Sequence, residues 1–147
     1  MAAGFWPWVL ATPGLPLVVC EGWKKALALV SHGWAAVALP GVSMGIRRDA
    51  ETGKRRLIAA LQQLASTKRT RGRSFTIAFD AEARPSTARK VGAAAGALAQ
   101  TLRAAGARPE VARLPLLPGT TKTGLDDLLV ARGEAALAAA LADTSPR

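Results

Sequence analysis

Short, unbroken runs of apolar residues alternate along the chain with longer segments in which apolar residues recur at helical spacing. The short runs contain β-branched or aromatic residues and predict buried strands at residues 17–20, 35–39, 74–79 and 111–114. The longer segments predict helices at residues 23–30, 54–65, 85–105, 124–131 and 134–142. Residues 44–53 and 66–73 are expected to be connecting segments that carry many basic side chains.

The regular alternation of strands and helices predicts an α/β fold with a mainly parallel, four-stranded sheet. The strands are continuously apolar, which is typical of parallel strands covered by helices on both faces. Residues 1–14 are rich in Pro and Trp without a clear period, so we expect a lead-in there and one domain over residues 15–147. Prolines interrupt the longest uncharged run, so the sequence predicts no membrane span, no signal peptide and a cytoplasmic location.

Composition excludes several classes of site. The chain has one cysteine, Cys20, one histidine, His32, and no tyrosine. A disulfide framework and a Cys/His zinc site are therefore excluded, and so is the covalent tyrosine link of a topoisomerase. Cys20 is expected to be a buried strand residue, and His32 is expected to end a helix.

The charge of the chain is strongly basic, with 20 Lys and Arg residues against 10 Asp and Glu and a formal net charge of +10. This balance favours a polyanionic partner, with nucleic acid as the first candidate, although a coding bias towards Arg and Ala would produce the same charge. The basic residues gather in one central segment, which is either a phosphate-binding surface or a solvated face. The candidates for phosphate contact are Lys24, Lys25, Arg47, Arg48, Arg55, Arg56, Lys68, Arg69, Arg71, Arg73 and Lys122.

Acidic residues are few, and five of them follow predicted strands. Glu21 comes directly after the first strand, Asp80 and Glu82 after the third, and Asp126 and Asp127 after the fourth and a glycine-containing turn. The carboxyl ends of parallel strands meet at one edge of the sheet, so these carboxylates can converge there. Carboxylate oxygens are ligands for Mg²⁺ or Mn²⁺. Each acid could instead cap the helix that follows it or interact with the dipole of that helix.

Two segments resemble the TOPRIM domain of bacterial-type primases, topoisomerases and some nucleases. Residues 17–22 form a hydrophobic strand that ends in Glu-Gly, and residues 75–82 form a strand that ends in Asp-x-Glu. More narrowly, residues 21–26, 38–42 and 119–129 resemble a TOPRIM-like domain of uncharacterised function (DUF3854) in plasmid and phage replication proteins of the primase type. The resemblance covers roughly residues 15–142.

The resemblance implies a Rossmann-like fold and Mg²⁺-dependent nucleotidyl or phosphoryl transfer on nucleic acid. It makes Glu21 a general acid/base or a metal ligand, and it makes Asp80 and Glu82 metal ligands. The family usually has Asp where this chain has Glu82, and the longer side chain would shift the metal or weaken its binding. Asp126 and Asp127 correspond to a late acidic pair of the narrower family, to which the resemblance assigns no role.

Three functions remain open at this point. The first is primer synthesis during DNA replication of a mobile element, with nucleotides and a single-stranded DNA or RNA template or primer as substrates. The second is a nuclease that uses the same residues with water as the nucleophile, and the third is a binding module without catalysis. The zinc module and polymerase subdomains of bacterial-type primases do not fit in 147 residues. We therefore expect either a larger assembly, with a replicative helicase as a natural partner, or a truncated relative.

Overall fold

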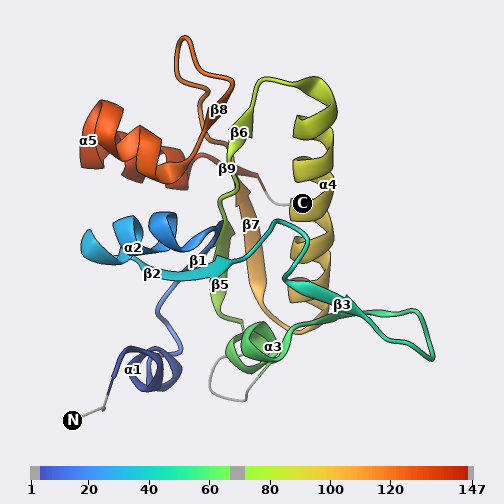
Figure 1. Cartoon of the computed structure of the whole chain (residues 1–147). Coiled ribbons are helices and arrows are strands. Elements are labelled where there is room, and N and C mark those ends of the chain that lie inside the picture. Colours follow the sequence, from blue (N-terminus) through green and yellow to red (C-terminus); the bar gives the residue numbers. More distant parts are fainter. Residues whose placement is uncertain (1–3, 67–71, 146–147) are drawn as a thin grey trace.

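The computed structural model describes residues 4–66 and 72–145 of the chain. The main strands are β1 (Leu17–Glu21), β2 (Ala35–Leu39), β5 (Ser74–Ile77), β7 (Arg108–Ala112) and β9 (Thr144–Ser145). The helices are α1 (Phe5–Ala11), α2 (Trp23–Ser31), α3 (Ala59–Ser66), α4 (Pro85–Ala104) and α5 (Leu125–Ala142). The strands form one sheet in the order β2–β1–β5–β7–β9, and the helices surround it (Figure 1).

The four parallel strands expected from the sequence are present in this sheet. β1 lies between β2 and β5, with Leu17 opposite both Ala35 and Phe75, and β7 continues the sheet beyond β5. β7 begins three residues earlier than predicted. The prediction excluded these residues because one of them is Pro109, and proline is disfavoured inside sheets. The sheet has a fifth strand that the sequence did not predict, because β9 is only two residues long and pairs antiparallel with β7.

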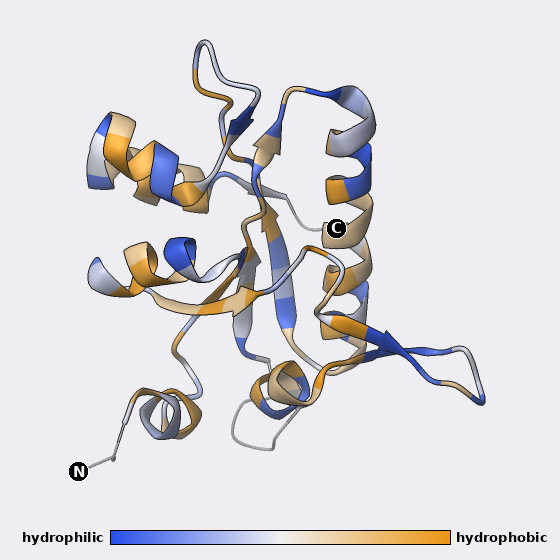
Figure 2. Ribbon diagram, in the orientation of Figure 1, coloured by the Kyte–Doolittle hydropathy of each residue, from blue (hydrophilic) through white to orange (hydrophobic). Residues whose placement is uncertain are grey.

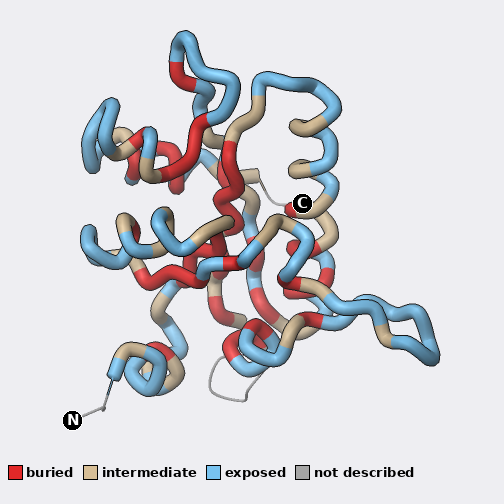
Figure 3. Tube along the Cα trace, in the orientation of Figure 1, coloured by how far each residue is buried: buried red, intermediate tan, exposed pale blue. Residues whose placement is uncertain are grey.

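Alternate residues of β1 face opposite sides of the sheet, as the two-residue period of a strand requires. Leu17 and Val19 belong to a hydrophobic core shared with α1, α3 and α4. Val18 and Cys20 belong to a second core shared with α2 and α5. The central strands are the buried segments in the middle of Figure 3. The prediction of helices on both faces of the sheet is therefore confirmed.

Residues 46–57 differ from the prediction, which placed a loop and the start of a helix there. They form an antiparallel hairpin of β3 (Ile46–Arg48) and β4 (Arg55–Leu57). The carboxylate of Asp49 accepts hydrogen bonds from the backbone N–H groups of Glu51 and Thr52 at 3.1 and 2.9 Å, and Gly53 adopts a φ of +66°. This turn chemistry overrides the helical periodicity. The hairpin extends from the body of the molecule, and most of its residues are hydrophilic (Figures 1 and 2).

Besides the later start of α3, the helices differ from the prediction in two places. The lead-in contains α1, and its Val9 is completely buried in the same core as Leu17. The two helices predicted at the carboxyl end are joined into α5 with a kink at Gly133, where φ is +83°. Within the described ranges, the structure contains no helix with the length and apolarity that crossing a bilayer requires.

Candidate functional site

The candidate site lies at the carboxyl ends of β1 and β5, which are neighbours in the sheet. The chain leaves β1 for α2 on one face of the sheet and leaves β5 for α4 on the other face. The place where successive connections leave for opposite faces of the sheet is its switch point. A crevice forms there, and ligands of parallel α/β sheets bind in it. Glu21 is the last residue of β1, and Asp80 follows β5 closely. The fold therefore brings these two predicted site residues to the same crevice.

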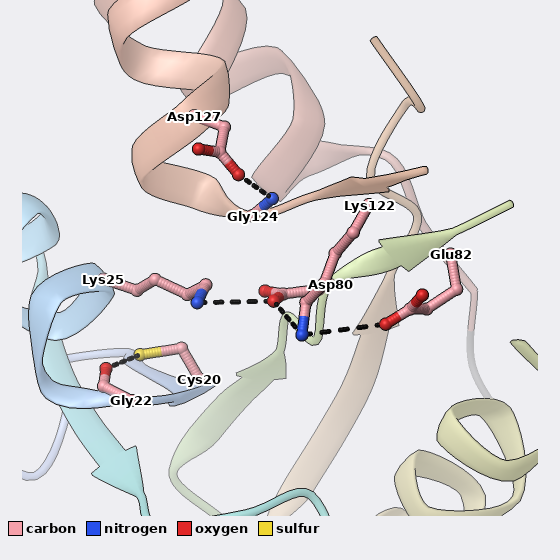
Figure 4. A network of polar contacts seen from close by, with 8 residues as sticks. All are labelled: Cys20, Gly22, Lys25, Asp80, Glu82, Lys122, Gly124 and Asp127. Carbon is pink, nitrogen blue, oxygen red and sulfur yellow. Dashed lines mark hydrogen bonds and ion pairs between the residues drawn. The ribbon is translucent and has the colours of Figure 1, made fainter. Parts of the chain in front are cut away.

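Asp80 is the centre of the site, and its side chain is only 2% exposed. Two ammonium groups approach its Oδ2, Lys25 Nζ at 3.3 Å and Lys122 Nζ at 3.1 Å (Figure 4). Lys25 comes from α2, and Lys122 comes from β8 (Lys122–Thr123). β8 pairs with β6 (Ala81–Glu82), so that Lys122 lies opposite Glu82 with Nζ 3.6 Å from Oε1. Residues distant in sequence thus form one charged network.

The second carboxylate oxygen of Asp80, Oδ1, is the best indication of a ligand. Both oxygens are buried without a well-aligned hydrogen bond among the described residues, but the two lysine ion pairs compensate Oδ2, which leaves Oδ1 as the uncompensated oxygen. A buried oxygen that lost its water without gaining a partner costs about 1–3 kcal/mol, and more when it carries charge. A divalent cation would satisfy this oxygen. Asp80 therefore fits the metal ligand that the TOPRIM resemblance implies.

Glu21, Asp80 and Glu82 all act on the same ammonium group. The pKa of Lys122 is raised above its ordinary value, first by its polar contact with Asp80 and then by the charges of Asp80, Glu21 and Glu82, although partial desolvation opposes the rise. The three predicted acids are therefore electrostatic neighbours.

The structure does not assemble these three acids into one ligand group. Within residues 4–66 and 72–145, no three His, Cys, Asp or Glu side chains are placed to hold a metal ion together. Glu82 is instead paired with Lys122. Of the expected metal ligands, Asp80 is the one whose free oxygen fits the role. This arrangement is compatible with Mg²⁺, which commonly takes one or two carboxylates and completes its shell with water and substrate phosphates.

The structure separates the roles of the two late acids. Asp127 Oδ2 accepts a hydrogen bond from the backbone N–H of Gly124 at 2.8 Å, so Asp127 caps the start of α5. This is the capping alternative considered for these acids, and the N-cap to N3 spacing could have indicated it. Asp126 behaves differently, because its Oδ1 is buried and has no hydrogen-bond partner among the described residues. Asp126 therefore belongs with Asp80, and nothing in the sequence marks this acid as buried without a partner.

Cys20 lies beside the same charges. The pKa of its thiol is raised to about 12, mainly by burial; Lys25 acts in the opposite direction, and the charges of Asp80 and Asp126 add to the rise. Cys20 is therefore a neutral core thiol at ordinary pH, as the sequence predicted for a buried strand residue.

The predicted basic residues fall into separate groups. Arg47, Arg48, Arg55 and Arg56 are all exposed on the β3–β4 hairpin, and Lys24 is exposed on α2. Lys68, Arg69 and Arg71 lie outside the described residues. Sequence reasoning missed the exposed basic residues of α4, among them Arg89, which lines a groove together with Arg55. Apart from Lys24 and Lys122, the exposed residues of the predicted set that the structure describes thus lie on the hairpin, next to this groove.

Arg73 does not belong to the exposed basic set, contrary to the prediction. Only 1% of it is exposed, and its guanidinium donates hydrogen bonds to the carbonyl oxygens of Leu15 at 2.7 Å and Val9 at 2.9 Å. The guanidinium satisfies backbone groups that would otherwise be buried without partners. Arg73 therefore holds α1 against the sheet and presents no charge to a ligand.

Three depressions that share lining residues lie between the acidic site and the hairpin. A cavity of about 330 Å³ is lined by Asp80 and Glu82 and by Ala88 and Gly92 of α4. Ala88 and Gly92 also line a groove of about 730 Å³ along α4, whose other wall includes Arg55. We call this second depression the α4 groove. Arg55 in turn borders a third depression that is lined by the other hairpin arginines.

A parallel α/β sheet with a buried carboxylate at its switch point defines the structural class of this protein. The chain belongs to the family described as "Domain of unknown function (DUF3854)", which it matches over residues 5–136. The predicted membership of DUF3854 is thereby confirmed, and the resemblance to the TOPRIM domain stays a prediction. An uncharacterized protein of Picosynechococcus sp. (strain PCC 7002) is 36% identical to this chain over 140 residues, which is 91% of this chain and 13% of that protein. No solved structure matches the chain significantly.

Proposed function

We propose that this chain is a metal-dependent nucleotidyl-transfer domain with a TOPRIM-like fold, the primase-like part of a plasmid or phage DNA replication protein. The observation that carries the proposal is the buried Asp80 carboxylate at the switch point, which has one free oxygen and two lysines at the other. A divalent cation suits the free oxygen, and the lysines suit the phosphates that accompany such a cation.

Each residue of the site has a defined task in primer synthesis. The 3′-hydroxyl oxygen of the growing strand attacks the α-phosphorus of a nucleoside triphosphate, the α–β bridging bond breaks, and pyrophosphate leaves. Glu21, half-buried at the end of β1, accepts the hydroxyl proton. Lys25 and Lys122 bind phosphate oxygens, and Glu82 positions Lys122 through their ion pair. Mg²⁺ or Mn²⁺ bound at Asp80 supplies neutralisation of phosphate charge.

The nucleic acid strand follows the α4 groove from the site to the hairpin. Exposed arginines line the far end of this path, and they can pair with phosphates without reading sequence. The shared lining of the depressions supports this route, because Ala88 and Gly92 border both the site cavity and the groove.

The domain acts within a larger protein or assembly. The matched relative is much longer than this chain, which spans 13% of it, and that length leaves room for further polymerase subdomains. A replicative helicase is the natural partner for a domain that makes primers on single-stranded DNA. The size of the relative supports the expectation that the isolated chain depends on additional segments for full activity.

A single gel assay tests the proposal. The full chain, its Asp80→Asn variant and a surface control, Glu134→Gln, are incubated with labelled single-stranded DNA, nucleotides and Mg²⁺ or Mn²⁺. Glu134 is exposed on α5 and belongs to no part of the site. We expect longer products from the wild type and the control, and loss of at least about a hundredfold in activity with Asp80→Asn. Equal products from Asp80→Asn and wild type would exclude the proposed site.

Two other outcomes identify the alternative functions. Shorter labelled products that disappear with Asp80→Asn identify a nuclease, which uses the same residues with water as the nucleophile. The second alternative, a non-catalytic binding module, is favoured by one specific observation: Lys25 and Lys122 neutralise Asp80 without any cation. Binding of single-stranded DNA that is unchanged by a chelator, with no product under any condition, identifies this module.

A further inference from the structure

We infer that Asp126 is a second ligand for the divalent cation and shares it with Asp80. This inference rests on the proposed function and deepens it, since it names the partner that completes the Asp80 cation site. The late acidic pair thereby acquires two different roles, with Asp126 at the cation and Asp127 at the helix cap.

The two unpartnered carboxylate oxygens lie around one point. Gly124 separates them, and a Cβ atom placed on this glycine would lie 2.7 Å from Asp126 Oδ1 and 3.1 Å from Asp80 Oδ1. Both oxygens are buried and have no hydrogen-bond partner in the described part of the chain. Two like charges that face the same small space repel each other unless a cation lies between them. Their shared lack of a partner therefore indicates one ligand for both.

The glycine itself supports this inference. The φ of Gly124 is −96°, a value that any residue adopts, so its backbone conformation does not explain the absence of a side chain. A Cβ would, however, collide with Lys25 Cε and with Asp126 Oδ1. A side chain at position 124 would therefore displace Lys25 and the Asp126 carboxylate from beside Asp80.

The lysines account for the charge balance of the site before the cation binds. The ion pairs of Lys25 and Lys122 are both made to Oδ2 of Asp80, and Oδ1 has no hydrogen-bond partner among the described residues. The chain can therefore bind a cation at the two Oδ1 atoms without first breaking these ion pairs. Two protein carboxylates are the number that Mg²⁺ commonly takes, with water and phosphate oxygens filling the remaining positions.

Direct Mn²⁺ binding to the full chain tests the inference, measured by electron paramagnetic resonance of free Mn²⁺ and by titration calorimetry. Asp126→Asn and Asp80→Asn are each expected to weaken Mn²⁺ binding by at least about tenfold. Asp127→Asn is the matched control, because an Asn oxygen can still accept the bond from Gly124, and its affinity should stay within about twofold. Circular dichroism confirms that each variant is folded.

A second variant separates ligation from general charge. Asp126→Glu keeps the charge but moves the carboxylate by one methylene. If Asp126 is a direct ligand, this variant binds Mn²⁺ more weakly, and if Asp126 acts only as a distant charge, the Mn²⁺ affinity stays unchanged. Affinity equal to wild type in both Asp126 variants, with binding lost in Asp80→Asn, would overturn the inference and leave the proposed function standing. Mn²⁺ binding that requires both aspartates, without polymerisation or cleavage, would support the inference and contradict the proposed function. Absence of Mn²⁺ binding by the wild type would overturn it outright.

Discussion

Cys20 precedes Glu21 in β1, and its side chain is completely buried between the sheet and the charged site. Its thiol is the only one in the chain. The residue packs as a small apolar group, although Asp80, Asp126 and Lys25 all influence it electrostatically. Its reactivity therefore reports on whether the interior at the end of β1 is intact.

The raised pKa of Cys20, about 12 instead of 9.0, gives a testable pH dependence. At pH 8 the folded chain should react with a thiol reagent about a thousandfold more slowly than the chain unfolded in guanidinium. The thiol pKa is about three units higher in the folded chain, so its thiolate fraction is about a thousandfold lower. As the pH rises past 9, Cys20 loses its thiol proton in the unfolded chain before it does so in the folded chain. The contribution of the buried neutral thiol to the unfolding free energy therefore falls until about pH 12.

Cys20→Ala is the control for this pH dependence, since other groups also titrate in alkali. The difference in unfolding free energy between wild type and Cys20→Ala should change in favour of the variant between pH 9 and pH 11. A fast thiol reaction in the folded wild type at pH 8 would contradict the burial of Cys20 in the second core.

At the scale of elements, the sequence predicted the segments that pack against the sheet. β1, α2 and α4 lie within one residue of their predicted bounds, because their apolar positions face the two cores. The β3–β4 hairpin was missed because hydrogen bonds to Asp49 determine it, and these compete with a helical period.

The same distinction applies to the candidate site. The position of Asp80 at the sheet edge follows from strand order, which periodicity reveals. The capping role of Asp127 could be predicted from its N3 position after Gly124. The placement of Asp126 beside Asp80 depends on packing between different elements, which the sequence does not reveal. The structural role of Arg73 was missed for the same reason, because its partners lie 58 and 64 residues away along the chain.

The β3–β4 hairpin provides a prediction at this scale. Replacement of Arg47, Arg48, Arg55 and Arg56 by Ala should weaken binding of single-stranded DNA. It should also reduce the slope of log K against log[salt] by about 0.7 for each phosphate that the variant no longer neutralises. Fluorescence anisotropy at several salt concentrations measures both quantities.

Arg132→Ala is the matched control for the hairpin variant. This arginine is exposed on α5 and lines a cavity that shares no residue with the hairpin depressions. Its salt slope should equal that of the wild type. If the hairpin variant and Arg132→Ala give the same slope, the hairpin does not bind the strand.

At the scale of the whole molecule, we expect the chain to fold without a bound divalent cation. Lys25 and Lys122 already neutralise Asp80, so a chelated chain is expected to unfold cooperatively. A Mn²⁺ concentration of about 100 times the dissociation constant should then add about 2.7 kcal/mol to the unfolding free energy. That corresponds to a rise of about 5–10 °C in Tm by calorimetry.

The Asp80→Asn variant should show no rise in Tm with Mn²⁺, because it lacks the carboxylate that binds the cation. A chelated wild-type chain without a cooperative transition would show that the lysines do not replace the cation, and an equal rise in both proteins would place Mn²⁺ binding elsewhere.

The part of α5 that follows the kink at Gly133 determines where an expressed fragment can end. The family match ends at residue 136, three residues beyond the kink, yet Leu137 and Leu141 are buried in the second core and β9 pairs with β7. Expression of only the matched span would expose the apolar surface that these leucines cover, and such surfaces aggregate. A fragment intended for crystallisation should therefore keep the chain at least to residue 145.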